Sequence, residues 1–162
     1  MLSEVEEFLG AMLPRQLTAE HALCAGDAGP RSETWSHHEP LTLFGAGVPL
    51  RRGWDEVSST SRRLADRFSE LREYELELIA SGASGDLAYT VGLEHKTVVA
   101  DGRPATYTLR VTHVYRREDG VWKIVHRHGD HVSLDTDAQE HASAPRPDAR
   151  PDAPVSSISR AT

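Results

Sequence analysis

The first third of the chain spaces its apolar residues with the period of helices. At the N-terminus the i, i+3, i+4 spacing of an amphipathic helix joins Val5, Phe8, Leu9, Met12 and Leu13. Pro14 should interrupt this helix, because a proline in a helix interior removes a hydrogen bond and clashes with the preceding turn. Further elements are predicted in order along the chain: a second helical piece over residues 18–26, a short helix within 27–35, a small hairpin over 41–50 and a long helix over 54–68.

The rest of the folded part changes to the two-residue period of β-strands. Four consecutive strands are predicted, over residues 71–80, 87–99, 105–116 and 121–132. The last two are joined by Glu118-Asp119-Gly120, a sequence typical of a tight turn. Because side chains alternate between the faces of a strand, one side of the last strand should carry Trp122, Ile124, His126 and His128. Two imidazoles in line with two apolar residues indicate the rim of a pocket.

Helices followed by an antiparallel meander are typical of an α+β domain. A long helix must cover one face of the sheet to bury its apolar residues, and a strongly curved sheet then forms a cone that is open at one end. An open cone with polar residues inside can hold a small molecule. The other face of such a sheet usually needs covering, so we expect a homodimer.

The domain is predicted to occupy residues 1–134, followed by a tail over residues 135–162 that is rich in Ala, Pro and Asp. This tail has almost no large apolar residues, so burial cannot offset its ordering entropy and we expect it to be disordered.

Composition narrows the function classes. A net charge of −7 argues against a nucleic-acid partner, which would require a basic patch. The single cysteine, Cys24, excludes an intrachain disulfide and is compatible with a reducing compartment. No apolar run approaches the ~20 residues that span a bilayer, so no membrane partner is expected. Three glutamates within residues 4–7 lie where a signal peptide would be basic and then apolar, so we expect the cytoplasm.

The order of elements and three short sequences resemble the NTF2-like superfamily, over about residues 5–132. These sequences are Leu87-Ala88-Tyr89, the hairpin from Tyr115 to Trp122 with its Arg-Arg and Asp-Gly pairs, and Val125-His126-Arg127-His128. Within the superfamily the chain is most similar to the SnoaL-like and kinase association-domain-like group. The resemblance implies a small-molecule-binding protein that could be a cofactor-free isomerase, cyclase or dehydratase, using acid–base chemistry on a hydrophobic substrate. The alternative is a non-catalytic module for ligand binding or dimerisation.

Candidate site residues follow from this resemblance and from the strand pattern. The predicted catalytic residues, which would polarise a carbonyl or move a proton, are His128, His126 and Arg110. The alternative for the histidines is a structural role, and for Arg110 an ion pair with Glu94 or Glu118 on the strand surface. SnoaL-type cyclases use an acidic residue on the last strands, for which Asp130 is the candidate.

The predicted pocket lining is Trp35, Trp54, Tyr89, Val91, Thr112 and Trp122. For the aromatic residues the alternative is ordinary core packing. Members related to the kinase association domain place arginines inside the cone, and two of those positions fall on Val91 and Thr112 here. That departure argues against a strongly anion-selective pocket.

The run His126–His131 also fits H-x-H-x-D-H, the metal signature of metallo-β-lactamase-fold hydrolases. That fold needs further ligands well downstream, where this chain offers only His141. Adventitious metal binding is the more plausible alternative, and neither a metal site nor a cofactor is predicted.

Overall fold

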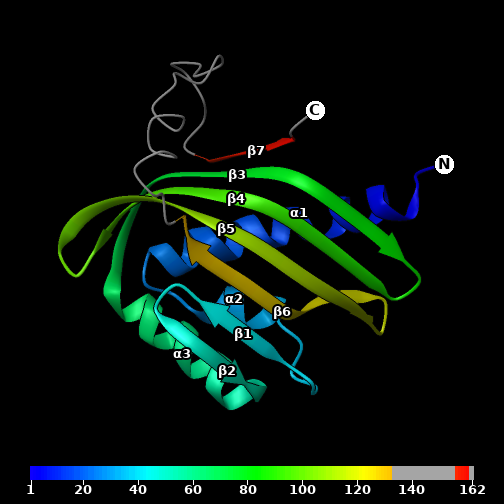
Figure 1. Ribbon diagram of the computed structural model, residues 1–162, viewed down its shortest axis with the longest axis horizontal. Helices are drawn as coiled ribbons and strands as arrows, with labels where there is room; N and C mark the ends of the chain where they lie inside the picture. Colours follow the sequence, from blue (N-terminus) through cyan, green and yellow to red (C-terminus); the bar gives the residue numbers. More distant parts are fainter. Residues whose placement is uncertain (133–155, 161–162) are drawn as a thin grey trace.

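The computed structural model describes residues 1–132 and 156–160 as three helices and one strongly curved sheet (Figure 1). The helices are α1 (Glu4–Cys24), α2 (Gly29–Thr34) and α3 (Gly53–Arg67). The strands are β1 (Thr42–Gly45), β2 (Val48–Arg52), β3 (Phe68–Ser84), β4 (Leu87–Ala100), β5 (Arg103–Glu118), β6 (Val121–His131) and β7 (Ser156–Arg160). They are ordered β2-β1-β6-β5-β4-β3-β7, with β1–β6 and β3–β7 parallel and the other pairs antiparallel. The predicted α+β class, the hairpin and the four-strand meander are confirmed.

Helix α1 is continuous, so the predicted interruption at Pro14 is wrong. Ser3 caps its N-terminus in a reciprocal capping box with Glu6, which satisfies backbone donors of the first turn. The buried face continues in register through the proline, from Phe8 and Met12 to Ala19 and Leu23. Packing on both sides of the proline therefore holds a helix that local propensity alone would break.

A one-residue bulge in β6 decides which side chains face the helices. Val114 of β5 pairs with His126 while the next residue, Tyr115, pairs with Ile124, so Val125 is an extra residue in β6. An inserted residue moves every later side chain to the opposite face. Trp122 and Ile124 are buried on the inner face, which α1 covers, but beyond the bulge the buried residues are Arg127 and Gly129. The prediction that His126 and His128 share a face with Trp122 and Ile124 is wrong.

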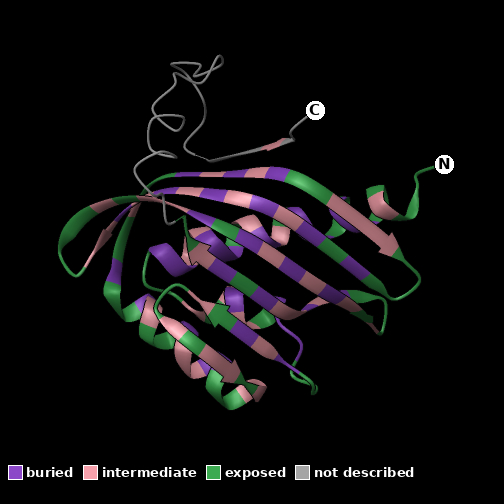
Figure 2. Ribbon diagram, in the orientation of Figure 1, coloured by how far each residue is buried: buried purple, intermediate pink, exposed green. Residues whose placement is uncertain are grey.

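The closed end of the cone is an aromatic core between α1 and the inner face of the sheet. The Phe8 ring meets the rings of Tyr115 and Trp122 edge-on, at centroid distances of 4.9 and 5.1 Å. A second apolar cluster, nearer the ends of α1 and α3, contains Leu23, Cys24, Ala65, Phe68 and Val98. Buried and less buried residues alternate along β4 and β5, as expected for a sheet covered on one face (Figure 2).

The predicted tail is partly within the described structure. Residues 156–160, expected to be disordered, form strand β7 beside β3, whereas 135–155 and 161–162 lie outside the described residues. Within the part of the chain that is described, no helix is both long and apolar enough to cross a membrane.

Candidate functional site

A cavity of about 650 Å³ opens on the inner face of the sheet, within the volume range of small-molecule sites. It lies between α3, the β1–β2 turn and the inner side of β4, β5 and β6. Its apolar wall includes Leu43, Val48, Leu64, Phe68, Ala100, Ala105, Tyr107 and Leu109. Its cationic side chains are Arg31, Arg51, Arg63, Arg67, Lys96 and Arg127, and no carboxylate is among the described residues that line it.

The innermost cations belong to a buried group of five charged side chains, called the charge cluster here: Glu20, Arg31, Glu94, Lys96 and Arg127. Arg127 donates twice to the Glu94 carboxylate, through Nη1 at 2.9 Å and Nη2 at 3.0 Å. The Lys96 ammonium lies 3.1 Å from Glu94 Oε2 and 2.8 Å from Glu20 Oε2. Arg31 Nη1 completes the chain, 3.1 Å from Glu20 Oε1. Three cations thus surround two carboxylates.

Four separate elements bring the charge cluster together. The two-residue period of β4 points Glu94 and Lys96 inward, and the bulge in β6 turns Arg127 to the same side. Glu20 lies on the buried face of α1 and Arg31 on α2. Because these residues are far apart in sequence, the cluster exists only in the folded state.

The charges of the cluster are fixed by mutual attraction. Burial alone would raise the pKa of Glu20, but Arg31 and Lys96 outweigh burial and lower this pKa to about 2. Glu94 is fully buried, yet Arg127 and Lys96 hold the pKa of its carboxyl well below the usual range. Burial opposes the charge on Lys96, but Glu20 and Glu94 raise its pKa above the ordinary value. Glu20, Glu94 and Lys96 are therefore charged near neutral pH, and a guanidinium is always protonated in proteins.

His113 adjoins the cluster as an uncharged acceptor. Its Nε2 atom lies 3.0 Å from Arg127 Nη1, which has no lone pair and must donate. Burial, reinforced by the Arg127 charge, lowers the pKa of His113 to about 3. With His113 neutral, three cations and two carboxylates leave the cluster with one uncompensated positive charge.

The residues predicted to be catalytic lie on the opposite, outer face of the sheet, away from this cavity. The side chain of Arg110 is 59% exposed and donates to both carboxylate oxygens of Asp130 at 2.9 Å. His126 Nδ1 lies 2.7 Å from the Thr42 hydroxyl, and both His126 and His128 meet the Phe44 ring edge-on. The structure thus brings these three residues onto one face with Asp130, and the ion pair expected with Glu94 or Glu118 is replaced by one with Asp130.

The predicted lining residues divide between core and outer face, and none lines the cavity. Trp35 and Trp122 are buried in the aromatic core, and Trp54 stacks on His37 with ring centroids 3.7 Å apart. Tyr89, Val91 and Thr112 occupy outward positions of β4 and β5. His131 is the one member of the H-x-H-x-D-H run whose imidazole lines the cavity, beside the Tyr107 ring at 5.4 Å.

The charge cluster was missed by sequence reasoning although β4 carried a signal. The inward positions of β4 are Ala88, Thr90, Gly92, Glu94, Lys96 and Val98. Glu94 and Lys96 are therefore two charged residues on a face that should be apolar. A charge at such a position is rarely buried unless it is paired or functional. The inward turn of Arg127 had no comparable signal.

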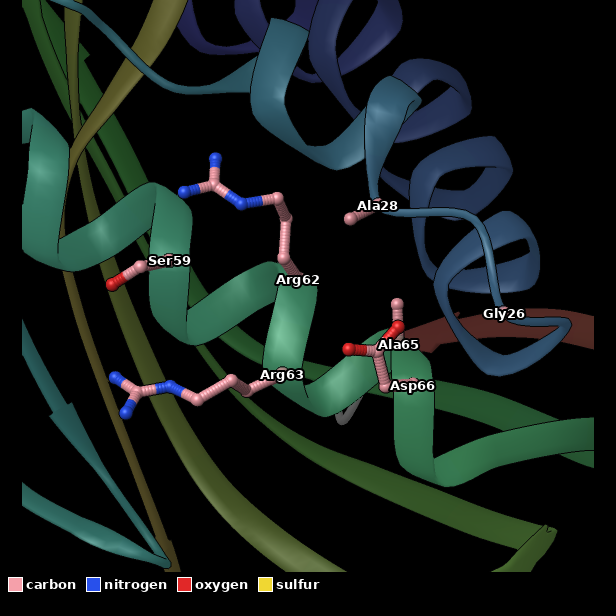
Figure 3. Close-up of a pocket in the computed structure, with 7 residues that line it drawn as sticks. All are labelled: Gly26, Ala28, Ser59, Arg62, Arg63, Ala65 and Asp66. Carbon is pink, nitrogen blue, oxygen red and sulfur yellow. The ribbon is translucent and has the colours of Figure 1, made fainter.

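A second hollow, of about 520 Å³, lies between α3 and the segment that follows α1 (Figure 3). Arg62 and Arg63 project from α3 there, with Asp66 one turn later, and Gly26 and Ala28 form the other side. It has no buried polar side chain in its lining and resembles ordinary solvated surface. No set of three or more His, Cys, Asp or Glu side chains within the described ranges is arranged to hold a metal ion, and His141 lies outside them.

A SnoaL-like domain model matches residues 21–132, most of the described domain. The chain belongs to the SnoaL-like family. No curated protein matches the sequence.

Solved structures share the fold of this SnoaL-like protein at low sequence identity. A proposed dehydratase of the NTF2-like family from Streptomyces avermitilis is 16% identical, with a TM-score of 0.66 over 80% of this chain and 99% of its own. A ketosteroid isomerase-like protein from Erwinia carotovora atroseptica is 18% identical, with a TM-score of 0.64 over 79% and 98%. A proposed calcium/calmodulin-dependent protein kinase type II association domain from Thiobacillus denitrificans is 18% identical, with a TM-score of 0.62 over 76% and 94%. These similarities confirm the NTF2-like fold, and the SnoaL-like domain match confirms the predicted family.

Proposed function

We propose that this SnoaL-like protein binds a small organic anion with an apolar body in the cavity on its inner face. The observation that carries the proposal is the uncompensated positive charge of the charge cluster. Buried charges are normally paired, because the desolvation of an unpaired ion is costly. An anionic group beside Arg31, Lys96 and Arg127 would balance the cluster, while Leu43, Val48, Leu64, Phe68, Tyr107 and Leu109 would contact the rest of the ligand.

Binding is favoured over acid–base catalysis by the protonation states in the cluster. A general base works best when its pKa lies near the working pH, whereas ion pairing holds the pKa of Glu20 at about 2 and that of Glu94 well below the usual range. Lys96 stays protonated, so its amine is no nucleophile. The non-catalytic alternative from the sequence is therefore the one we propose, and the homodimer and the hydrophobic substrate remain predictions.

Two aromatic probes of the same shape test the proposal. 1-Anilinonaphthalene-8-sulfonate carries a sulfonate, and N-phenyl-1-naphthylamine has the same rings without it. The sulfonate probe should bind about 10-fold more tightly or better, because one charge-assisted hydrogen bond contributes roughly 1.5–3 kcal/mol. Fluorescence titration of both probes measures this ratio.

Arg31→Met is the informative variant, because it removes the surplus charge and leaves two cations facing two carboxylates. Its affinity for the sulfonate probe should fall to that of the neutral probe, whereas Arg31→Lys should retain most of the preference. Arg110→Met is the matched control, since it removes the same charge from the outer face. Equal binding of the neutral probe by all variants would show that the cavity is intact. Unchanged sulfonate binding by Arg31→Met would refute the proposal.

A further inference from the structure

Strand β3 would be an edge of the sheet without the C-terminal segment. Its neighbour on one side is β4 and on the other is β7, which pairs with it in parallel from Tyr74 opposite Ser156 to Leu78 opposite Arg160. The Ser159 hydroxyl also donates to Glu75 Oε1 at 3.1 Å. An unpaired edge strand presents a row of backbone donors and acceptors to any extended chain, so this pairing covers a surface on which another strand could add.

Charge restricts which strand can add to this edge. Residues 70–77 of β3 contain four glutamates and one arginine, whereas Ser156–Arg160 contains one arginine and no acidic residue. Like charges directly opposite each other destabilise a strand pair, so a second copy of β3 is a poor partner. A neutral or basic segment is a good one.

The chain length allows the segment to reach the edge of its own molecule. Strand β6 ends at His131 and β7 begins at Ser156, so residues 132–155 connect them. β7 lies four strands from β6 in the sheet, about 19 Å at the usual spacing of strands. A connection of this length can span up to about 80 Å. A segment tethered in this way is present at an effective concentration of about millimolar.

We propose that the β3 edge over Tyr74–Leu78 is a docking site for an extended strand without acidic residues, and that Ser156–Arg160 of the same chain is its tethered, displaceable occupant. The site is formed by backbone and selected by the glutamates of β3, so it is independent of the anion cavity. Its consequence is that an untethered strand of this kind can bind β3 only after β7 has left.

Proline substitution in the full-length chain tests the docking. Ser157→Pro combined with Ile158→Pro removes two backbone donors in β7, and Ser157→Thr combined with Ile158→Val is a matched control that keeps both. Hydrogen exchange measured by NMR should show faster exchange at alternate amides of residues 74–78 in the proline variant only. The intervening amides face β4 and should stay protected. Equal exchange in both variants would overturn the proposal.

A peptide with the sequence of residues 153–162 tests the site in trans. It should bind the proline variant and restore protection at the same β3 amides, whereas the wild-type chain should require about millimolar peptide, because its own segment competes. A peptide with Ser159→Glu should bind the proline variant more weakly, because it replaces the hydroxyl that donates to Glu75 with a second carboxylate. Failure of the peptide to bind, equal binding of the Glu peptide, or dimerisation of the proline variant through β3 would each overturn the assignment of the occupant.

Discussion

Acidification to pH 4.5 should destabilise the protein through His113. The imidazole is buried and accepts from Arg127, and burial together with the Arg127 charge lowers its pKa from 6.5 to about 3. Below pH 6.5 the His113 imidazole therefore binds a proton in the unfolded chain but stays neutral in the folded chain. The stability from this depressed pKa is fully present above pH 6.5 and is lost as pH falls toward 3.

The expected loss follows from linkage. One proton bound only by the unfolded state lowers the free energy of unfolding by about 1.4 kcal/mol per pH unit. Because the unfolded imidazole is already half protonated at pH 6.5, the loss between pH 6.5 and 4.5 is about 2.3 kcal/mol, a large share of a typical domain stability. Glu20 adds to the loss only below its unfolded pKa of 4.5, because its folded pKa is about 2. His126, whose pKa is lowered by partial burial and by His128, acts in the same direction at an outer-face position.

Urea unfolding at half-unit intervals between pH 7.5 and 4.5 measures this loss. His113→Gln keeps a side-chain oxygen able to accept from Arg127 but cannot titrate. Between pH 6.5 and 4.5 the free energy of unfolding of the variant should fall less steeply than that of the wild type. The difference in slope should correspond to about one proton bound on unfolding. If both proteins lose stability with the same slope, His113 is not the group that resists protonation, and the reasoning from its burial fails.

Two further predictions concern backbone space and thiol reactivity. Gly92→Ala places a Cβ 2.7 Å from the Glu77 carbonyl oxygen and should destabilise the protein by about 1–3 kcal/mol. Gly10→Ala in helix α1 meets no atom within 4 Å and should stabilise the protein by up to about 1 kcal/mol. Denaturant titration measures both free energies of unfolding, and a Gly92→Ala protein more stable than the Gly10→Ala protein would contradict the prediction. Burial raises the pKa of Cys24 to about 11, so a thiol-reactive disulfide reagent at pH 8 should label it only at the rate of unfolding, and rapid stoichiometric labelling of the native protein would disprove its burial.

The meander was predictable because its signals are local. Each strand from β3 to β6 carries its own alternation, and the turn at Asp119-Gly120 adopts the positive φ angles that its sequence favours. The faces of β6 were not predictable, because the bulge at Val125 depends on how β5 pairs with it and has no glycine to mark it. That single extra residue moved the predicted catalytic histidines to the outer face and brought Arg127 inward.

The charge cluster was beyond sequence reasoning for a different reason. Two of its members, Glu94 and Lys96, break the apolar face of β4 and could have been noticed. The other members are Glu20 in α1, Arg31 in α2 and Arg127 in β6, and no local sequence pattern predicts that these three elements lie close together. Burial of charges is tolerated only when partners meet, so the cluster is a property of tertiary structure rather than of any segment.

The charge cluster and His113 respond to acid differently, and this separates binding from stability. Ion pairing keeps Glu20 ionised down to a pKa of about 2, so the net charge of the charge cluster is constant from neutral pH to well below 4.5. His113 stays neutral over the same range because of its depressed pKa, and it adds no charge to the cavity. Acid should therefore reduce the fraction of folded protein without weakening the affinity of the folded protein for a strong-acid anion such as a sulfonate. A binding site built from coupled ion pairs is insensitive to pH as long as the fold that holds them persists.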